Sequence, residues 1–189
     1  STLDRSSAAS DVYKRQLLSS KLFDDKGNYM SPTYSYNRHK KRYRYYVSQA
    51  NIQHKKDLAG SVNKIPGDEI ENIVKQEIAA FISNKTIIQP YLNNYALEVQ
   101  NKILSSLEDL KLNDQIIRLI VHKVTISKDN IVLELNKNIT IKILENIAYN
   151  KEIPINIQDT ECIIIKKDIK IISTPSHGNK LIIGDEVKY

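Results

Sequence analysis

The stretch that decides the fold is YSYNRHKKRYRYYV, from Tyr34 to Val47. Aromatic and basic residues alternate in its second half, and an alternation with a period of two is typical of a β-strand. One face of this strand would carry Arg42, Arg44 and Tyr46, and the other would carry Tyr43, Tyr45 and Val47. The polar residues 37–41 predict an exposed loop ahead of the strand.

This stretch lies in the most basic part of the chain. Residues 26–56 contain no Asp or Glu, although the whole chain has 22 acidic residues and a net charge of +6. Lys and Arg residues that neutralise phosphates release counterions, so such a segment is typical of a nucleic-acid-binding surface. A solvated charged loop without a partner is the alternative interpretation. The candidate DNA-binding residues are Arg38, Lys40, Lys41, Arg42, Arg44, Lys55 and Lys56.

Two roles are open for the tyrosines of this segment, Tyr34, Tyr36, Tyr43, Tyr45 and Tyr46. We expect Tyr43 and Tyr45 to pack inside a small sheet while the arginine face meets phosphates. For Tyr34 and Tyr36 the alternatives are packing, which we favour, and stacking on bases or sugars. A nucleophilic Tyr45 or Tyr46 is not indicated, because the spacing supplies neither a base nor an oxyanion-stabilising cluster.

The remaining composition excludes several kinds of site. Cys162 is the single cysteine, so an internal disulfide and a multi-cysteine zinc site are both excluded, and we expect it to be a buried apolar filler. His39, His54, His122 and His177 lack metal-ligand spacing, and no Gly-rich phosphate loop is present. We expect no catalytic residue, metal or cofactor in this chain. The longest apolar run, residues 78–82, is too short to cross a bilayer, and we expect a cytoplasmic protein without membrane contact.

Apolar spacing predicts both strands and helices. Residues 17–23 and 29–30 predict a hairpin around a turn at residues 24–28, and Pro32 is expected to break the strand pairing after it. Residues 48–65 have little periodicity and predict a basic connection. Helices are predicted from Asp68 to Ser83 with Asp68 as the cap, from about Tyr91 to Leu110, and from the cap Asn113 to Ile120.

Beyond residue 121 the pattern becomes mostly β. Residues 124–135 predict a hairpin, whereas residues 139–149 fit either a strand or a helix. Short strand candidates follow at residues 153–157, 162–165, 169–172 and 181–183. We therefore predict an α+β fold with a β-ribbon (17–65), a helical hairpin (66–121) and a β-rich C-terminal unit (122–189). Residues 1–16 have no periodicity and are interpreted as a non-native or disordered segment.

The run KLFDDKGNYMSPTYSYNRHKKRYRYYVSQA, from Lys21 to Ala50, resembles the ribbon that follows the recombinase domain in large serine site-specific recombinases. The shared features are a short hairpin with a Gly-containing turn ahead of Met30, a basic loop and a Tyr-Arg-Tyr-Tyr strand. The rest of the chain is similar to this family only in its overall pattern. The resemblance implies a DNA-binding and assembly module whose partners are double-stranded DNA, an upstream catalytic domain and further copies of the protein.

The chain departs from this family in two ways. Many relatives bind zinc through cysteine pairs in the ribbon, whereas here Phe23, Lys26 and Ser48 stand at ligand positions. Packing of Leu22, Phe23, Met30 and the tyrosines is expected to hold the ribbon instead. The family's nucleophilic serine lies in an N-terminal domain that nothing here resembles. The parent protein would exchange DNA strands through a phosphoserine link, but this chain is not expected to cut DNA by itself.

Two other functions fit the same residues. An RNA-binding basic protein would prefer structured or single-stranded RNA to duplex DNA. An oligomerisation domain with an incidental basic loop would bind DNA weakly and with little dependence on salt. Within the recombinase family, the apolar stripe through Val99, Ile103 and Leu107 would suit contacts between copies. An intramolecular helical hairpin explains this stripe more economically.

Overall fold

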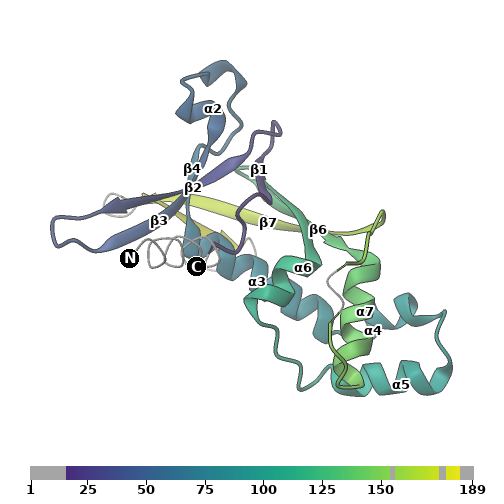
Figure 1. Cartoon of the computed structure of the whole chain (residues 1–189). Helices are drawn as coiled ribbons and strands as arrows, with labels where there is room; N and C mark the ends of the chain where they lie inside the picture. Colours follow the sequence, from purple (N-terminus) through teal and green to yellow (C-terminus); the bar gives the residue numbers. More distant parts are fainter. Residues whose placement is uncertain (1–15, 154–155, 175–177, 184–189) are drawn as a thin grey trace, which may run out of the picture. The chain divides into compact units, whose positions relative to one another are not determined.

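A computed structural model of the chain describes residues 16–153, 156–174 and 178–183, with the backbone alone for residues 172–174, 178–180 and 182–183 (Figure 1). Its mixture of helices and sheets confirms the predicted α+β class. The chain divides into two compact units. Unit 1 comprises the residues up to Asn72, Lys123–Val132 and those from Lys166 onward, and unit 2 comprises Ile73–His122 and Leu133–Ile165. Both units are discontinuous in sequence, whereas the sequence analysis divided the chain into consecutive segments.

A three-stranded antiparallel sheet with strand order β2-β3-β4 forms the centre of unit 1. Its strands are β2 (Met30–Tyr36), β3 (Arg42–Ser48) and β4 (Lys64–Pro66). The β2–β3 hairpin is in register from the Met30–Ser48 pair to the Tyr36–Arg42 pair. The predicted strand from Arg42 and the exposed loop at residues 37–41 are therefore confirmed.

The prediction that Pro32 breaks the strand pairing is wrong, because Pro32 pairs with Tyr46 in the middle of β2. The backbone N–H of Asn37 donates to the carbonyl of Lys41. Hydrogen-bonded pairs therefore recur at every second position from there, and Pro32 falls between them. The N–H that proline lacks would point away from β3, at the free edge of the sheet, so no ladder hydrogen bond is lost.

The N-terminal hairpin was predicted only in part. Residues 17–21 form turns rather than a strand, and β1 (Leu22–Asp24) pairs in parallel with β5. The turn at residues 24–28 is present, but a single bridge between Phe23 and Tyr29 is all that pairs its two sides. Leu22 and Met30 are fully buried, as the packing of the ribbon requires.

The second sheet has the strand order β1-β5-β6-β7-β8. The predicted hairpin is confirmed as β5 (Val121–Ile126) and β6 (Asn130–Asn136). The two strands predicted at residues 162–165 and 169–172 are one continuous strand, β7 (Cys162–Thr174), which is followed by β8 (Gly178–Ile183). Residues 153 and 156–157 are not in a strand, and residues 154–155 of that candidate lie outside the described residues.

The longest helix, α3 (Gly67–Ser83), confirms the strongest helical pattern in the sequence. Its predicted apolar stripe is buried at Ile70, Val74, Ile78 and Ile82. The α2 helix (Gln49–Ile52) and the 3-10 turn η1 (Lys56–Leu58) lie in the segment that had no periodicity. No helix among the described residues is both long and apolar enough to cross a membrane.

The second helix is shorter than predicted. Residues 85–106 are divided among α4 (Lys85–Ile88), η2 (Gln89–Leu92) and α5 (Leu97–Ser106), because Pro90 and the Asn93–Asn94 pair interrupt the helix. The apolar stripe is nevertheless formed, with Ile103 and Leu107 buried inside unit 2. This burial agrees with intramolecular packing of the stripe.

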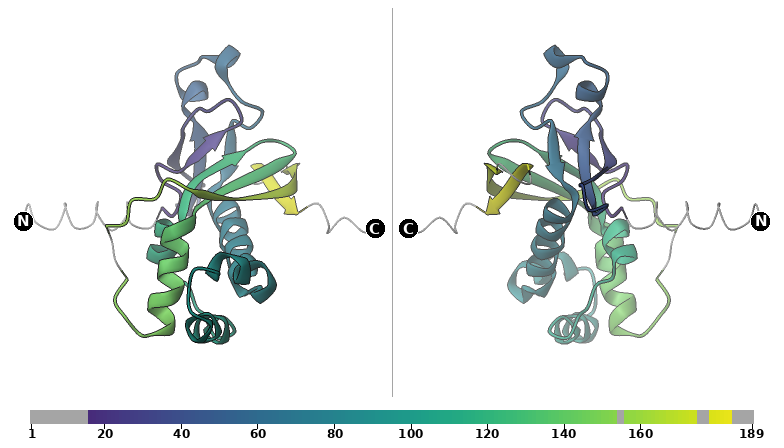
Figure 2. Two further views of the ribbon diagram at one scale, coloured as in Figure 1. Left: turned by 90° about the vertical axis from the view of Figure 1, so that its right-hand side faces the viewer. Right: turned by 90° about the vertical axis from the view of Figure 1, so that its left-hand side faces the viewer.

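The last two helices complete unit 2. Helix α6 (Asp114–Ile120) confirms the prediction, because the Asn113 side chain accepts a hydrogen bond from the Ile116 N–H at its start. The ambiguous segment is a helix, α7 (Lys137–Ala148), which contacts both α5 and α6 (Figure 2). Its buried residues Thr140, Ile141 and Leu144 follow the helical period, which the alternating isoleucines obscured in the sequence.

Candidate nucleic-acid interface

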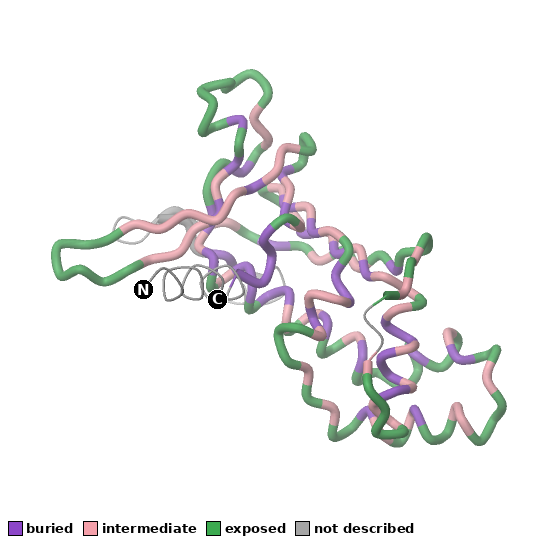
Figure 3. The backbone as a smooth tube through the Cα atoms, in the orientation of Figure 1, coloured by how far each residue is buried: buried purple, intermediate pink, exposed green. Residues whose placement is uncertain are grey.

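The β2–β3 hairpin ends in a loop that Asn37 organises. The Asn37 side-chain oxygen accepts hydrogen bonds from the N–H groups of His39 (3.0 Å) and Lys41 (2.9 Å). Lys40 adopts the left-handed backbone conformation, with φ of 58°, that a three-residue hairpin loop requires at its last position. Every residue from Tyr36 to Arg42 is exposed, and Figure 3 shows this tip in the exposed colour on both strands. The loop therefore presents Arg38, Lys40 and Lys41 to solvent.

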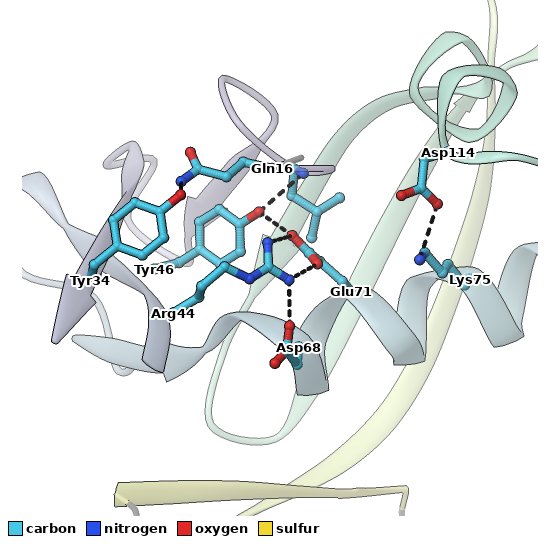
Figure 4. Close-up of polar contacts among 9 residues, drawn as sticks. Gln16, Tyr34, Arg44, Tyr46, Asp68, Glu71, Lys75 and Asp114 are labelled. Carbon is cyan, nitrogen blue, oxygen red and sulfur yellow. Dashed lines mark hydrogen bonds and ion pairs between the residues drawn. The ribbon is translucent and has the colours of Figure 1, made fainter. Parts of the chain in front are cut away.

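Arg42 lies at the start of β3 and is exposed as well. Its guanidinium carbon is 4.6 Å from the centre of the Tyr34 ring, a cation–π contact within one face of the hairpin. The hydroxyl of Tyr34 accepts a hydrogen bond from the side-chain amide of Gln16 (Figure 4). Tyr34 is thus a packing residue, and it positions Arg42 beside the loop.

Arg44 is not available to phosphates in the way that the sequence predicted. Its guanidinium donates to Glu71 at 2.7 and 3.3 Å and also pairs with Asp68, both on the first turns of α3 (Figure 4). Burial alone would lower the pKa of Arg44, but the hydrogen bonds to Glu71 and Asp68 outweigh it and raise the pKa. Two carboxylates therefore neutralise this half-buried cation, and Arg44 leaves the set of candidate DNA contacts. Asp68, predicted as the helix cap, serves as one of these two partners.

Tyr46 lies beside Arg44 and is 1% exposed. Its hydroxyl donates to Glu71 (2.7 Å) and accepts from the Leu18 N–H (3.1 Å). Burial, followed by the charge of Glu71, raises the pKa of Tyr46 above its ordinary range. The hairpin is thereby fixed to α3 through one polar cluster, which consists of Arg44, Tyr46, Asp68 and Glu71 and in which Tyr46 and Glu71 are buried.

We predicted that Tyr43 and Tyr45 pack inside the sheet while the arginine face of β3 meets phosphates, and this assignment of the two faces is therefore wrong. The side chains alternate as expected, but the face with Arg44 and Tyr46 is the one that is buried near the base of the hairpin. Tyr43 and Tyr45 are only half-buried. The Nζ atom of Lys41 lies 5.4 Å from the Tyr43 ring centre, and that of Lys64 lies 4.0 Å from the Tyr45 ring centre. Sequence alone could not assign the faces, because the carboxylates that bury Arg44 lie more than twenty residues later.

A second basic segment is the arm formed by residues 49–63. It contains α2 and η1, and both Lys55 and Lys56 are exposed on it. His54 at its bend has a positive φ of 57°. The predicted residues therefore form two groups in unit 1, one at the hairpin tip and one on the arm (Figure 1).

Asp24 ties this arm to the ribbon. Its buried carboxylate accepts hydrogen bonds from the N–H groups of Lys26 (3.0 Å), Asn28 (2.8 Å) and Gly60 (3.0 Å) and from the Ser48 hydroxyl (3.0 Å). Burial would raise the pKa of Asp24, but the hydrogen bonds from the Asn28 side chain and N–H, the Gly60 N–H and the Ser48 hydroxyl outweigh it and lower the pKa. Sequence reasoning identified only a turn at this position and missed the carboxylate.

Position 60 lies so close to this carboxylate that only glycine fits there. A Cβ atom on Gly60 would lie 2.8 Å from the Asp24 Cβ and even closer to the Asp25 side chain. Lys26 and Ser48 are both joined through Asp24. The carboxylate thus links the turn, the end of β3 and the arm through hydrogen bonds.

Other candidate chemistry is sparse in the described parts of the chain. No three His, Cys, Asp or Glu side chains converge as possible metal ligands there. Cys162 is exposed, so its prediction as a buried filler is wrong. His39, His54 and His122 are exposed, and His177 lies outside the described residues.

Comparisons of the chain with protein-family models, with curated proteins and with solved structures found no match. The resemblance of residues 21–50 to a recombinase ribbon therefore stays a prediction. The exposed basic tip of the hairpin is the best-defined candidate site in the chain.

Proposed function

We propose that this chain is the DNA-binding and assembly portion of a serine site-specific recombinase, and that its β2–β3 hairpin holds duplex DNA. The observation behind the DNA-binding proposal is the exposed cluster Arg38, Lys40, Lys41 and Arg42 at the end of a two-stranded ribbon. The major groove of B-DNA is about 12 Å wide and admits a two-stranded β-ribbon. A hairpin of this kind can reach into the groove while its cations contact the phosphates on either side.

The electrostatics of the segment support this proposal. Residues 26–56 contain no carboxylate, and the cation nearest the base of the hairpin, Arg44, is already neutralised by Asp68 and Glu71. The positive charge of the segment is therefore concentrated at the tip, and Lys55 and Lys56 add a smaller group on the arm, where Asp57 offsets one of them. Two such groups would let one unit contact phosphates at two places along a duplex.

The recombinase part of the proposal is supported by the ribbon itself. Asp24 connects Lys26, Ser48 and Gly60, so the turn, the end of β3 and the arm form one connected unit without a metal. A zinc-less ribbon held in this way agrees with the resemblance of residues 21–50. The catalytic step would belong to another domain of the parent protein. A resolvase-type catalytic domain encoded immediately upstream is expected, and an unrelated upstream domain would contradict the recombinase assignment.

DNA binding is tested by neutralising the tip. We expect the double variant Lys40→Ala/Lys41→Ala to bind a short duplex more weakly and to reduce the slope of log affinity against log salt by about 2, since each phosphate contact contributes about 0.9 to that slope. The matched control is Lys111→Ala/Lys166→Ala, which removes the same charge from two exposed positions outside the hairpin and the arm. Fluorescence anisotropy at several salt concentrations measures both quantities. Equal slopes for the two double variants would contradict the proposed site.

The same titration separates DNA from RNA. If the chain is a duplex-DNA-binding module, unlabelled duplex DNA competes better than structured or single-stranded RNA of the same length. The reverse order of competition would favour the RNA-binding alternative and would overturn the proposed function.

A further inference from the structure

Tyr36 differs from every other tyrosine of the hairpin in its exposure. Its side chain is 67% exposed, whereas Tyr46 is 1% exposed and Tyr34, Tyr43 and Tyr45 are half-buried. Tyr34 is hydrogen-bonded to Gln16, and cations lie over the rings of Tyr43 and Tyr45. Tyr36 is the last residue of β2, immediately before the basic loop. Because the Tyr36 ring is exposed, a smaller polar residue at this position would pack equally well.

We infer that Tyr36 contacts a base directly, and that the hairpin tip prefers duplex DNA with a locally unpaired or unstacked step on which this ring can stack. This inference rests on the proposed function, because it names the kind of DNA that the same tip would bind. The ring face of tyrosine stacks on any base, and each such stack changes affinity about five- to hundredfold when the ring is removed.

The neighbours of Tyr36 are suited to this role. Tyr36 pairs with Arg42, so both side chains emerge on the same face of the hairpin. The guanidinium of Arg42 is directed to the Tyr34 ring, 4.6 Å away, and thus toward the base of the hairpin rather than toward its tip. On this face of the hairpin, Arg42 is stacked on Tyr34, and Tyr36 lies next to them on the side of the tip. These three side chains form a row along the hairpin. A base placed against Tyr36 would extend that row outward.

The charges around Tyr36 favour the same ligand. Arg38, Lys40 and Lys41 follow Tyr36 in the exposed loop, and they can contact the phosphates that flank an opened step. Unstacking a base costs least where it is mismatched or already unpaired. A single exposed ring in a basic loop would therefore distinguish a mismatched step from an intact one, which phosphate contacts alone cannot do.

The experiment compares two duplexes that differ only in one central mismatch, with 2-aminopurine beside the mismatch as a fluorescent reporter of stacking. We expect the unmodified chain and Tyr36→Phe to bind the mismatched duplex at least about fivefold more tightly than the matched one and to change the reporter fluorescence. Tyr36→Ala should lose this preference and the fluorescence change, while its salt slope on the matched duplex stays that of the unmodified chain. Circular dichroism of each variant verifies the fold, which an exposed side chain should not affect.

The possible results separate this inference from the proposed function. If the chain binds matched duplex with a steep salt slope but shows no preference for the mismatch, or if Tyr36→Ala keeps that preference, then the inference about Tyr36 is wrong and the proposed function stands. If neither duplex is bound, or if Lys40→Ala/Lys41→Ala leaves the salt slope unchanged, then the proposed function itself is wrong.

Discussion

Arg42 and Arg44 show how two identical residues on one strand face acquire different roles. They are two positions apart on β3, yet Arg42 is exposed at the tip and Arg44 is enclosed by Asp68 and Glu71. A buried cation needs a paired carboxylate, because desolvation of an unpaired charge costs several kcal/mol. Glu71, which is 4% exposed, needs Arg44 for the same reason. Distance from the base of the hairpin therefore determines whether an arginine on this face is structural or available to a ligand.

This difference predicts opposite effects for two single substitutions. Arg44→Ala should lower the free energy of unfolding by about 2–3 kcal/mol, somewhat less than the loss of a fully buried ion pair, because the Arg44 side chain is 22% exposed. Arg42→Ala should change stability by less than about 0.5 kcal/mol but reduce the salt slope of duplex binding by about 1. Urea unfolding and salt titration measure the two effects. Arg44→Ala with unchanged stability and a reduced salt slope would restore Arg44 as a DNA contact.

At the scale of elements, the sequence predicted best where one period dominates. The α3 helix and the β5–β6 hairpin follow their apolar patterns, and Asn113 begins α6 as expected. Prediction failed where tertiary contacts decide the outcome. Residues 17–21 were predicted as a strand from their apolar content, but they form turns.

The candidate site was predictable to a similar extent. The polar residues 37–41 identified the tip of the hairpin correctly as exposed. Which tyrosines pack could not be derived from their spacing, because the partners of Tyr34 and Tyr46 are Gln16 and Glu71, far away in sequence. The structural role of the Asp24 carboxylate was missed because a turn alone accounts for the sequence DDKGN. The partners Ser48 and Gly60 lie far away in the sequence.

Asp24 allows a test of how the ribbon and its arm are held together. Asp24→Asn should lower the free energy of unfolding by about 1–3 kcal/mol, because an amide offers fewer acceptor sites to the Ser48, Gly60 and Asn28 donors. The matched control is Asp57→Asn on the arm itself, whose exposed side chain should matter by less than about 0.5 kcal/mol. Chemical unfolding of both variants provides the comparison. Equal stability of the two would show that Asp24 does not hold the arm.

The same carboxylate predicts a dependence on acid. The pKa of Asp24 in the folded chain lies below its ordinary value of 3.8, so the unfolded chain takes up this proton first as the pH falls. The contribution of Asp24 to stability is therefore complete above about pH 4 and is lost below it. Asp24→Asn should be less stable at neutral pH but should show a smaller further loss between neutral and strongly acidic solution. If the free energy of unfolding fell equally with decreasing pH in the unmodified chain and in Asp24→Asn, Asp24 would not be the group responsible.

At the scale of the whole molecule, a tyrosine hydroxyl donates a hydrogen bond to a carboxylate in the described part of each unit. In unit 1 the pair is Tyr46 and Glu71, at 2.7 Å. In unit 2 it is Tyr95 and Glu145, at 2.8 Å, which joins the segment ahead of α5 to α7. A phenol donates this bond only while it is protonated, so both units depend on the same ionisation.

These two bonds predict that the chain loses stability in alkaline solution. Burial and the bond to Glu145 raise the pKa of Tyr95 from 10.0 to about 12, and burial with the charge of Glu71 raises the pKa of Tyr46. The unfolded chain therefore releases these protons first, so the stabilisation is complete below pH 10 and falls as the pH rises toward 12. Tyr95→Phe should be about 1 kcal/mol less stable at neutral pH and should lose less stability above pH 10 than the unmodified chain. The double variant Tyr46→Phe/Tyr95→Phe should lose still less stability as the pH rises. Urea unfolding at a series of pH values measures the free energy of unfolding. An alkaline loss of stability that is as steep in the double variant as in the unmodified chain would show that other groups cause it.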